Sequence, residues 1–199
     1  MKPILTLLIP ALSLYSNLSA QPADTLHKEK KYYHFINFEF GKANNSWIYL
    51  QGGYAIQKQH AYLKLKVDGT EEPRGFILDF GDEPKESTSA FNVLIGKSYM
   101  VGAYNTFQFG AGLSYVEDIS RGAFIRNTCT SYFCLLDHDI YETIKRKNIG
   151  LPIEVRYNLI FTKDIGLSFS ANANLNSLKS YTGFSAGIVV GRLRDKIKK

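Results

Sequence analysis

Residues 165–175 read Ile-Gly-Leu-Ser-Phe-Ser-Ala-Asn-Ala-Asn-Leu, in which every odd position is apolar and every even position is small or polar. Successive side chains of a β-strand point to opposite faces, so this alternation predicts a strand with one apolar and one polar face. The same period of two runs through residues 107–115, 149–161 and 182–190. A tilted strand of about ten residues is long enough to cross a bilayer. The pattern therefore predicts an all-β fold, an antiparallel up-and-down transmembrane β-barrel.

The chain of 199 residues contains nine candidate strands, separated by Gly, Pro, Asn and charged residues. Residues 68–73, for example, are interpreted as the turn between the third and fourth candidates. Bacterial barrels of this type have an even number of strands. We therefore expect eight strands, with ten as the alternative, and an interior filled by side chains instead of an open pore. The candidates are residues 32–40, 47–56, 61–67, 75–80, 91–101, 104–116, 149–161, 165–175 and 181–193.

The first twenty residues predict an export signal, because Lys2 precedes an apolar stretch and small residues lead to a cleavage point after Ala20. Residues 21–31 are expected to be a flexible periplasmic lead-in, residues 32–195 the barrel and residues 196–199 a basic tail. After the signal no run of eighteen apolar residues predicts a transmembrane helix. The net charge of +6 can suit nucleic acid, but an exported chain rarely meets any, so no such partner is expected.

The lengths of the connections predict an orientation. Outer-membrane barrels join their strands by short turns on the periplasmic side and by longer loops outside the cell. Residues 162–164 and 102–103 are short enough to be periplasmic turns. Residues 81–89, 119–148 and 176–180 then become outer loops. We expect the longest of these, residues 119–148, to contact a protein partner or a small-molecule ligand.

The two cysteines, Cys129 and Cys134, lie close together in this predicted outer loop. In an oxidising compartment, a pair with this spacing can close a small disulfide-bonded loop. A metal site is the alternative, because Asp137 and His138 are near. Two cysteines and one histidine are an incomplete ligand set for structural zinc. The sequence therefore predicts a disulfide, and neither a metal nor any other cofactor.

The polar faces of two predicted strands carry residues that are large for a barrel interior. Buried polar groups need partners, so these side chains are expected to form a polar network inside the barrel. Glu154 and Arg156 lie two positions apart on one face, so we expect each to pair with another strand. A role in holding the barrel together is favoured over catalysis. The network residues are Glu154, Arg156, Asn158, Asn172 and Asn174.

The chain contains an ordered set of short motifs at residues 110–116 (Gly-Ala-Gly-Leu-Ser-Tyr-Val), 121–122 (Arg-Gly), 149–155 (Ile-Gly-Leu-Pro-Ile-Glu-Val), 171–176 (Ala-Asn-Ala-Asn-Leu-Asn) and 191–194 (Gly-Arg-Leu-Arg). This set resembles small outer-membrane β-barrel proteins of the Bacteroidetes group. The resemblance covers roughly residues 90–195 and implies a barrel in the outer membrane of a Gram-negative bacterium. It brings no shared catalytic residues with it. The chain departs from the usual barrel ending, because a basic tail replaces a terminal aromatic residue.

No pattern in the chain predicts an enzyme. The G-x-S-x-G nucleophile motif and the H-E-x-x-H metal motif are both missing from the sequence. We therefore expect a non-enzymatic barrel with a structural or surface-interaction role, surrounded by outer-membrane lipid. Two alternatives stay open. One is a soluble exported barrel, similar to lipocalins, whose apolar faces point inward around an apolar ligand. The other is an outer-membrane enzyme that modifies lipid.

Overall fold

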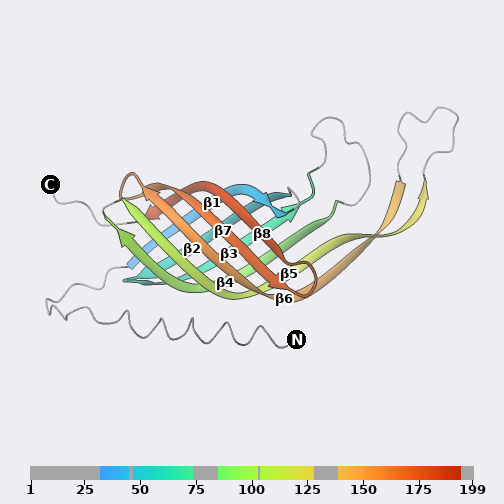
Figure 1. The fold of residues 1–199 in the computed structure, drawn as a ribbon, viewed down its shortest axis with the longest axis horizontal. Coiled ribbons are helices and arrows are strands. Elements are labelled where there is room, and N and C mark those ends of the chain that lie inside the picture. Colours follow the sequence, from blue (N-terminus) through green and yellow to red (C-terminus); the bar gives the residue numbers. More distant parts are fainter. Residues whose placement is uncertain (1–31, 45–46, 74–84, 103, 128–138, 194–199) are drawn as a thin grey trace, which may run out of the picture. The chain divides into compact units, whose positions relative to one another are not determined.

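The computed structural model describes residues 32–44, 47–73, 85–102, 104–127 and 139–193, and these form a closed barrel of eight antiparallel strands (Figure 1). Each strand pairs with the next in the chain, and the last strand closes the ring on the first. The expected up-and-down barrel of eight strands is therefore confirmed. The strands are β1 (Tyr32–Ala43), β2 (Ile48–Lys58), β3 (Ala61–Glu71), β4 (Ser87–Val101), β5 (Asn105–Asn127), β6 (Asp139–Ile160), β7 (Ile165–Asn176) and β8 (Tyr181–Arg192).

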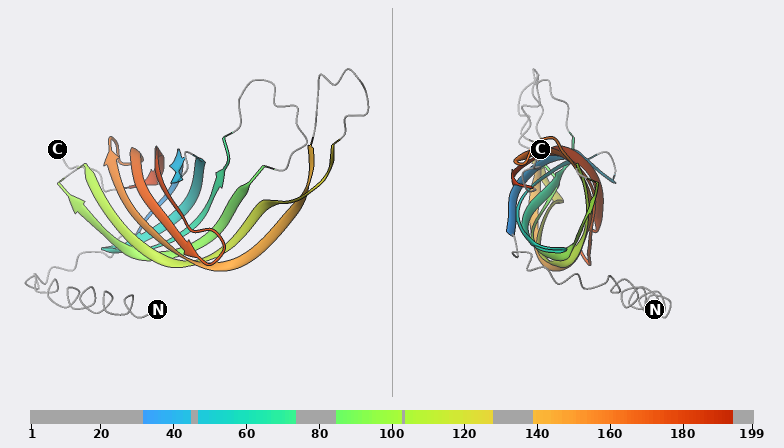
Figure 2. Two further views of the ribbon diagram at one scale, coloured as in Figure 1. Left: turned by 45° about the vertical axis from the view of Figure 1, so that its right-hand side comes forward. Right: turned by 90° about the vertical axis from the view of Figure 1, so that its left-hand side faces the viewer.

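Figure 2 (right) shows the ring of strands in a view along the barrel. The two ends of the barrel differ in the length of the connections between strands. At one end the connections are residues 59–60, 102–104 and 161–164, and we name this the short-turn end. β1 begins and β8 finishes there, because His34 pairs with Arg192. The opposite end carries the longer connections, including residues 72–86 and 128–138, and we name it the long-loop end. Among the described residues, no helix has the length and apolarity needed to cross a membrane.

The alternation of side chains makes the outer surface apolar and the interior polar. Phe109, Val155 and Phe169 point outward and are 47%, 41% and 46% exposed. The neighbouring side chains Gln108 and Arg156 are buried inside the barrel. This is the reverse of a soluble ligand-binding barrel, so the lipocalin-like alternative is wrong. An apolar outer belt around a polar interior is the surface that a bilayer requires of a spanning barrel, and such barrels occur in the outer membrane of Gram-negative bacteria.

A cluster of apolar side chains lies inside the barrel near each end. At the short-turn end, a buried cluster is formed by Phe35, Ala55, Ile160, Val189 and Leu193. At the long-loop end, Ala43, Tyr49 and Tyr181 form a second cluster, against which Trp47 packs. Between the two clusters most buried side chains are polar or charged. Most of the polar interior therefore lies between the two apolar clusters.

One sequence prediction needs correction at the long-loop end. Residues 119–148 were expected to be an outer loop, but β5 continues to Asn127 and β6 begins at Asp139. Figure 1 shows this pair continuing as a two-stranded ribbon past the other strands. Beyond the bilayer both faces of a hairpin are wet, so the apolar alternation stops although the backbone pairing goes on. Charged residues such as Arg146 and Lys147 therefore led to the prediction of a loop where the structure has a strand.

Two shorter breaks were also misplaced, because polar residues that face the barrel interior resemble turn residues in the sequence. Residues 68–71, expected to be part of a turn, belong to β3, and residues 87–89, expected to be part of an outer loop, belong to β4. Asp68 and Thr70 are buried, because in this barrel polar residues face inward. The predicted strand at residues 75–80, the export signal and the cysteines Cys129 and Cys134 lie outside the described residues and stay predictions.

Candidate functional site

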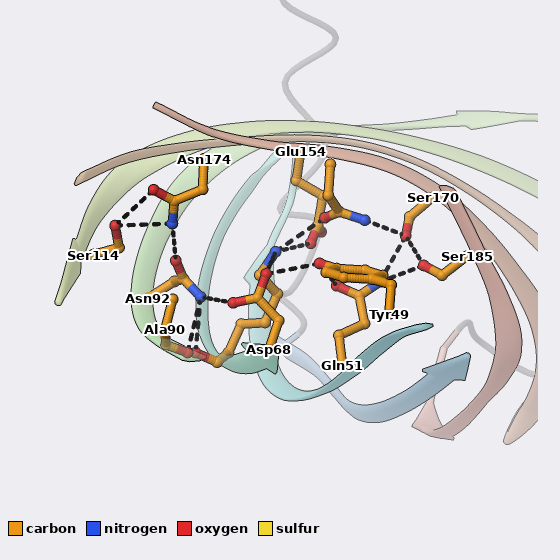
Figure 3. A network of polar contacts seen from close by, with 12 residues as sticks. Tyr49, Gln51, Asp68, Ala90, Asn92, Ser114, Glu154, Ser170, Asn174 and Ser185 are labelled. Atoms are coloured by element: carbon orange, nitrogen blue, oxygen red, sulfur yellow. Dashed lines mark hydrogen bonds and ion pairs between the residues drawn. The ribbon is translucent and has the colours of Figure 1, made fainter. Parts of the chain in front are cut away.

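The centre of the barrel holds a cluster of charged side chains that spans the interior (Figure 3). Lys64 of β3 donates to both carboxylate oxygens of Glu154 of β6, at 2.9 and 2.8 Å. Lys66, one inward position along β3, lies with its Nζ 3.5 Å from Glu154 Oε2 and 3.0 Å from Asn172 Oδ1. β3 and β6 are not neighbours in the barrel, so these contacts cross it.

A second ion pair joins β6 to β1. Arg156 Nη2 lies 2.8 Å from Glu39 Oε1 and 3.4 Å from Glu154 Oε2, and all three side chains are fully buried. Glu39 also accepts hydrogen bonds from β2, β7 and β8, which surround it with donors. These donors are Gln51 Nε2 and the hydroxyls of Ser168, Ser170 and Ser185.

The network continues from the central charges toward the long-loop end. Asp68 accepts hydrogen bonds from the hydroxyls of Tyr49, at 2.7 Å, and Tyr181, at 3.0 Å. Asn92 donates to Asp68 and accepts from Asn174 Nδ2 at 3.3 Å, while Asn174 also donates to Ser114 at 3.0 Å. These contacts link the charged centre to the aromatic cluster that closes the long-loop end.

The structure thus brings together four of the five residues expected in the interior. Glu154 and Arg156 each pair with a different strand, and Asn172 and Asn174 bond to neighbours inside the barrel. Asn158 is also buried, one inward position closer to the short-turn end than Arg156. Its side-chain oxygen accepts no hydrogen bond from any described residue.

The charges at the centre of the interior balance one another, which indicates a structural role for this cluster. Three carboxylates, Glu39, Asp68 and Glu154, are matched by three cations, and every member contacts a charge of opposite sign. Buried charges are tolerated when they are paired and hydrogen-bonded. Lys66 and Asp68 belong to the same strand, but Glu154 contacts Lys64 and Lys66 across the barrel and Arg156 contacts Glu39 across it. These cross-barrel pairs tie the barrel wall together through its centre. The cations are Lys64, Lys66 and Arg156.

Half of this network comes from strands whose alternation was not analysed from the sequence. In β1, Asn37 and Glu39 alternate with Ile36, Phe38 and Phe40. In β3, the polar residues alternate with Leu63, Leu65 and Val67 in the same way. The period of two that located Glu154 and Arg156 was therefore the signal for the remaining members. The residues that were missed include Glu39, Tyr49, Gln51, Lys64, Lys66, Asp68 and Asn92.

A close approach between Tyr62 and a glycine gives a stability prediction. A Cβ atom on Gly110 would overlap the Tyr62 hydroxyl oxygen and would lie 3.0 Å from the Tyr62 Cζ. We expect Gly110→Ala to lower the free energy of unfolding by about 1–3 kcal/mol, as overpacking does. No described residue bonds the Tyr62 hydroxyl, so Tyr62→Phe alone should change little and should partly rescue Gly110→Ala. Denaturant unfolding of the four proteins measures this.

The matched control for that double-mutant cycle is Gly52→Ala. A Cβ at Gly52 would lie 3.5 Å from the Phe38 ring and 3.9 Å from the Asn37 carbonyl oxygen, which are ordinary contact distances. We expect this variant to stay within about 0.5 kcal/mol of the parent. If Gly52→Ala and Gly110→Ala lose equal stability, a general glycine effect is acting and the specific contact with Tyr62 is not responsible.

The second candidate surface is the hairpin formed by β5 and β6 past the barrel rim. We name residues 117–127 and 139–147 the hairpin stem, in which Glu117 pairs with Lys147 and Asn127 with Asp139. Two register shifts interrupt the pairing between Arg121 and Arg126, as bulges do when they twist a ribbon. Beyond Ile119 these strands pair only with each other, since the last contact of β4 is Ser87 with Ile119.

The hairpin stem exposes both basic and aromatic side chains. Lys145, Arg146 and Lys147 are consecutive exposed residues on β6. Nearer the tip, Phe124 is 54% exposed and its ring packs edge-on against Tyr141, with centroids 5.7 Å apart. Basic side chains beside exposed rings form a surface that suits an anionic partner with some apolar character.

Two ion pairs fix the rim below the hairpin stem. Arg121 Nη2 lies 3.0 Å from Glu72 Oε2, which joins the stem to the connection after β3. Lys179 Nζ lies 3.1 Å from Glu86 Oε2 and 3.8 Å from the centre of the Trp47 ring. These ion pairs join separate loops at the long-loop end. They therefore restrict the motion of the rim from which the hairpin stem extends.

Comparison with known proteins supports the fold without assigning a family. No family model and no curated protein matches the sequence. The N-terminal barrel domain of Pseudomonas aeruginosa OprF is similar in structure, with a TM-score of 0.52 and 9% identity over 80% of this chain and 96% of that one.

Two further solved barrels resemble the chain in the same way. Ail, the attachment invasion locus protein of Yersinia pestis, has a TM-score of 0.53 and 7% identity over 82% of this chain and 99% of its own. Neisserial surface protein A has a TM-score of 0.50 and 13% identity over 80% and 96%. The chain therefore has the fold of small outer-membrane barrels.

Proposed function

We propose that this protein is a non-enzymatic outer-membrane barrel that presents the hairpin stem outside the cell to bind an anionic ligand. The observation that carries this proposal is the length of two strands. β5 and β6 contain 23 and 22 residues, whereas β1, β2, β3, β7 and β8 contain 11 or 12. Crossing the bilayer needs only about ten residues, so half of each long strand is available for contacts outside it.

The orientation follows from the connections. Short turns face the periplasm in barrels of this kind, and longer loops face outward. The long-loop end, with the hairpin stem, is accordingly assigned to the cell exterior. The sequence resemblance to Bacteroidetes barrels fits this orientation and is part of the proposal.

The charges left exposed on the stem favour an anionic ligand. Arg121 is already paired with Glu72, and Asp118 is buried and accepts a hydrogen bond from Thr88 at 2.9 Å. The exposed charge on β6 near the rim is that of Lys145, Arg146 and Lys147, with Glu142 on the same strand and Glu117 opposite Lys147 on β5. Lys145 and Lys147 lie on one face of the ribbon and Arg146 on the other, and their summed field attracts polyanions.

A solved relative in fold binds a ligand of this class. Ail of Yersinia pestis has been solved in complex with the heparin analogue sucrose octasulfate, and that barrel matches this chain with a TM-score of 0.52 at 9% identity. We propose the same class of ligand for this protein, but we transfer no binding residues from Ail. Sulfated or carboxylated saccharides are the chemistry that the basic stem would recognise.

The test is binding of immobilised heparin by the full chain, folded in detergent micelles. We expect retention that weakens with salt, because exposed charges are screened. The triple variant K145Q/R146Q/K147Q should lose affinity by about tenfold or more, since each exposed ionic contact contributes up to about 1 kcal/mol. The control K58Q/K163Q removes two charges from the short-turn end and should bind normally. Equal loss in both variants would mean that only net charge matters and would contradict the proposal.

The barrel interior favours a non-enzymatic role. Its charged groups are fully buried and paired with one another, and an apolar cluster lies between them and each end on part of the ring. A catalytic group has to reach its substrate, which this packing prevents. The lipid-modifying alternative would instead need a reactive group on the outer surface facing lipid.

A further inference from the structure

The outer surface of the barrel carries a groove on one side. It has a volume of about 560 Å³ and crosses five consecutive strands, from β5 through β8 to β1. Its surface is almost entirely apolar. One residue from each strand lines it at the same register: Phe107, Tyr157, Phe169, Ala186 and Phe40.

The groove runs diagonally between the two ends of the barrel. Phe107 lies two residues from the short-turn end of β5, whereas Phe40 lies three residues from the long-loop end of β1. A path at right angles to tilted strands rises along the barrel, which explains this course. Four spacings of about 4.8 Å between neighbouring strands make the groove roughly 19 Å long. This is a long and narrow shape.

Small residues form the floor of the groove and aromatic rings form its walls. Ala171 and Ala186 leave room between the rings of Phe169 and Phe184, the second of which is 74% exposed. At the lower end, the Phe107 and Tyr157 rings pack with their centroids 4.9 Å apart. The Tyr157 hydroxyl donates to Asn105 Oδ1 at 2.8 Å, which holds that ring in place.

A basic residue stands at the upper end of the groove. Lys42 is exposed, lies two positions after Phe40 on the same face of β1, and pairs with Phe184. The upper end is the long-loop end, which the proposed function assigns to the outer leaflet. A cation at the headgroup level, above an apolar groove at the chain level, matches a lipid with an anionic head.

We propose that this groove binds one acyl chain of a phosphorylated lipid of the outer leaflet, whose phosphate contacts Lys42. The inference rests on the proposed function, because it needs the barrel to be inserted with its long-loop end outward. The hydrocarbon would lie across Ala186 and Ala171 between the aromatic walls. The occupant is a single slender chain because the groove is narrow and apolar along its length.

A second copy of the chain fits this surface less well. A symmetric pair needs a patch that is complementary to itself. Here the projecting rings of Phe40 and Phe184, 60% and 74% exposed, stand beside the hollow and would hold two barrel walls apart. Contact through two rings would bury far less area than a stable interface requires.

The experiment is native mass spectrometry of the full chain in detergent, titrated with lipid A. We expect one lipid to be retained by the parent, and A171F and A186F to weaken its retention at least about tenfold. Lys42→Gln should weaken it about threefold, as expected for an exposed charge pair. A phosphatidylcholine of the same chain length should bind more weakly than lipid A. All substituted side chains point outward, so the interior network stays intact.

Two control variants share the chemistry of the substitutions but not the location. Ala111→Phe adds a ring to the outer face of β5, away from the groove, and Lys85→Gln removes an exposed cation from the long-loop end near β4. Both should retain lipid A as the parent does. Equal retention by A186F and the parent, or equal retention of the two lipids, overturns the inference.

Separate measurements test whether the barrel is inserted in the membrane, as the proposed function requires. Heat-dependent gel mobility and the need for detergent report insertion of the barrel, whether or not lipid A binds. An inserted barrel without selective lipid binding would overturn the groove assignment alone. Masses of two chains that disappear in A186F would identify a second copy as the occupant and would also overturn it.

Discussion

Replacing Arg156 with methionine is expected to lower the free energy of unfolding by about 3–5 kcal/mol, the usual cost of removing one partner from a buried ion pair. Arg156 is the only cation within 4 Å of Glu39 among the described residues, at 2.8 Å, and both side chains are fully buried. Without it, the Glu39 charge keeps only its hydrogen-bond donors. Unfolding by urea in lipid vesicles, followed through the fluorescence of Trp47, the only tryptophan of the chain, measures the change.

The double variant E39Q/R156M is the control for this interpretation. It removes both charges together, and a buried pair replaced as a unit often costs little. We expect it to recover at least about 1 kcal/mol of the loss, which is a coupling energy typical of residues in contact. If the double variant is as unstable as R156M or less stable, the loss comes from cavity formation or from the Glu154 contact, and the Glu39 pair is not the main support.

The sequence alone predicted the membrane-spanning part of this fold because one physical rule acts on every residue there. Lipid outside and packed polar groups inside give each strand a period of two, which is visible in Phe169 and Ser170 or in Val155 and Arg156. The same rule located Glu154 and Arg156 on the face that the structure buries. Their partners Lys64 and Glu39 could have been located in the same way, although the identity of each pair could not.

Pairing across the interior depends on the tilt and register of the closed ring, and no local pattern records these. Lys64 and Glu154 are ninety residues apart in sequence and meet because β3 and β6 face each other across the barrel. The groove over Ala186 also depends on strand tilt and register, because it combines residues of five strands at one register. Single strands predict which face a residue occupies, but not its neighbours.

The hairpin stem shows where the rule no longer applies. Outside the bilayer no apolar face is required, so residues such as Lys145 and Arg146 carry no alternation that marks a strand. Ile119, Thr143 and Ile144 do have the branched side chains that favour strands. Strand propensity, and not polarity, was therefore the signal for this segment. It was hidden by the charges that make the segment a candidate binding surface.

Introducing a charge into the apolar belt is the second large effect that we expect. Leu65 lies near the middle of β3, is 44% exposed on the outer face, and pairs with Tyr54 and Val93. Leu65→Arg should lower the free energy of unfolding in vesicles by about 2–4 kcal/mol, the cost of arginine at the bilayer midplane.

The cost of a charge on the outer face should depend on depth, and this dependence separates insertion from a general folding defect. Thr182 is exposed on the outer face at the long-loop end of β8, so Thr182→Arg should cost only about 0–1 kcal/mol. In detergent-free buffer containing no lipid, neither variant should be distinguishable from the parent, because the barrel should not fold there. Equal costs at the two positions in vesicles would mean that Leu65 does not face the hydrocarbon, and the membrane-spanning assignment would have to be abandoned.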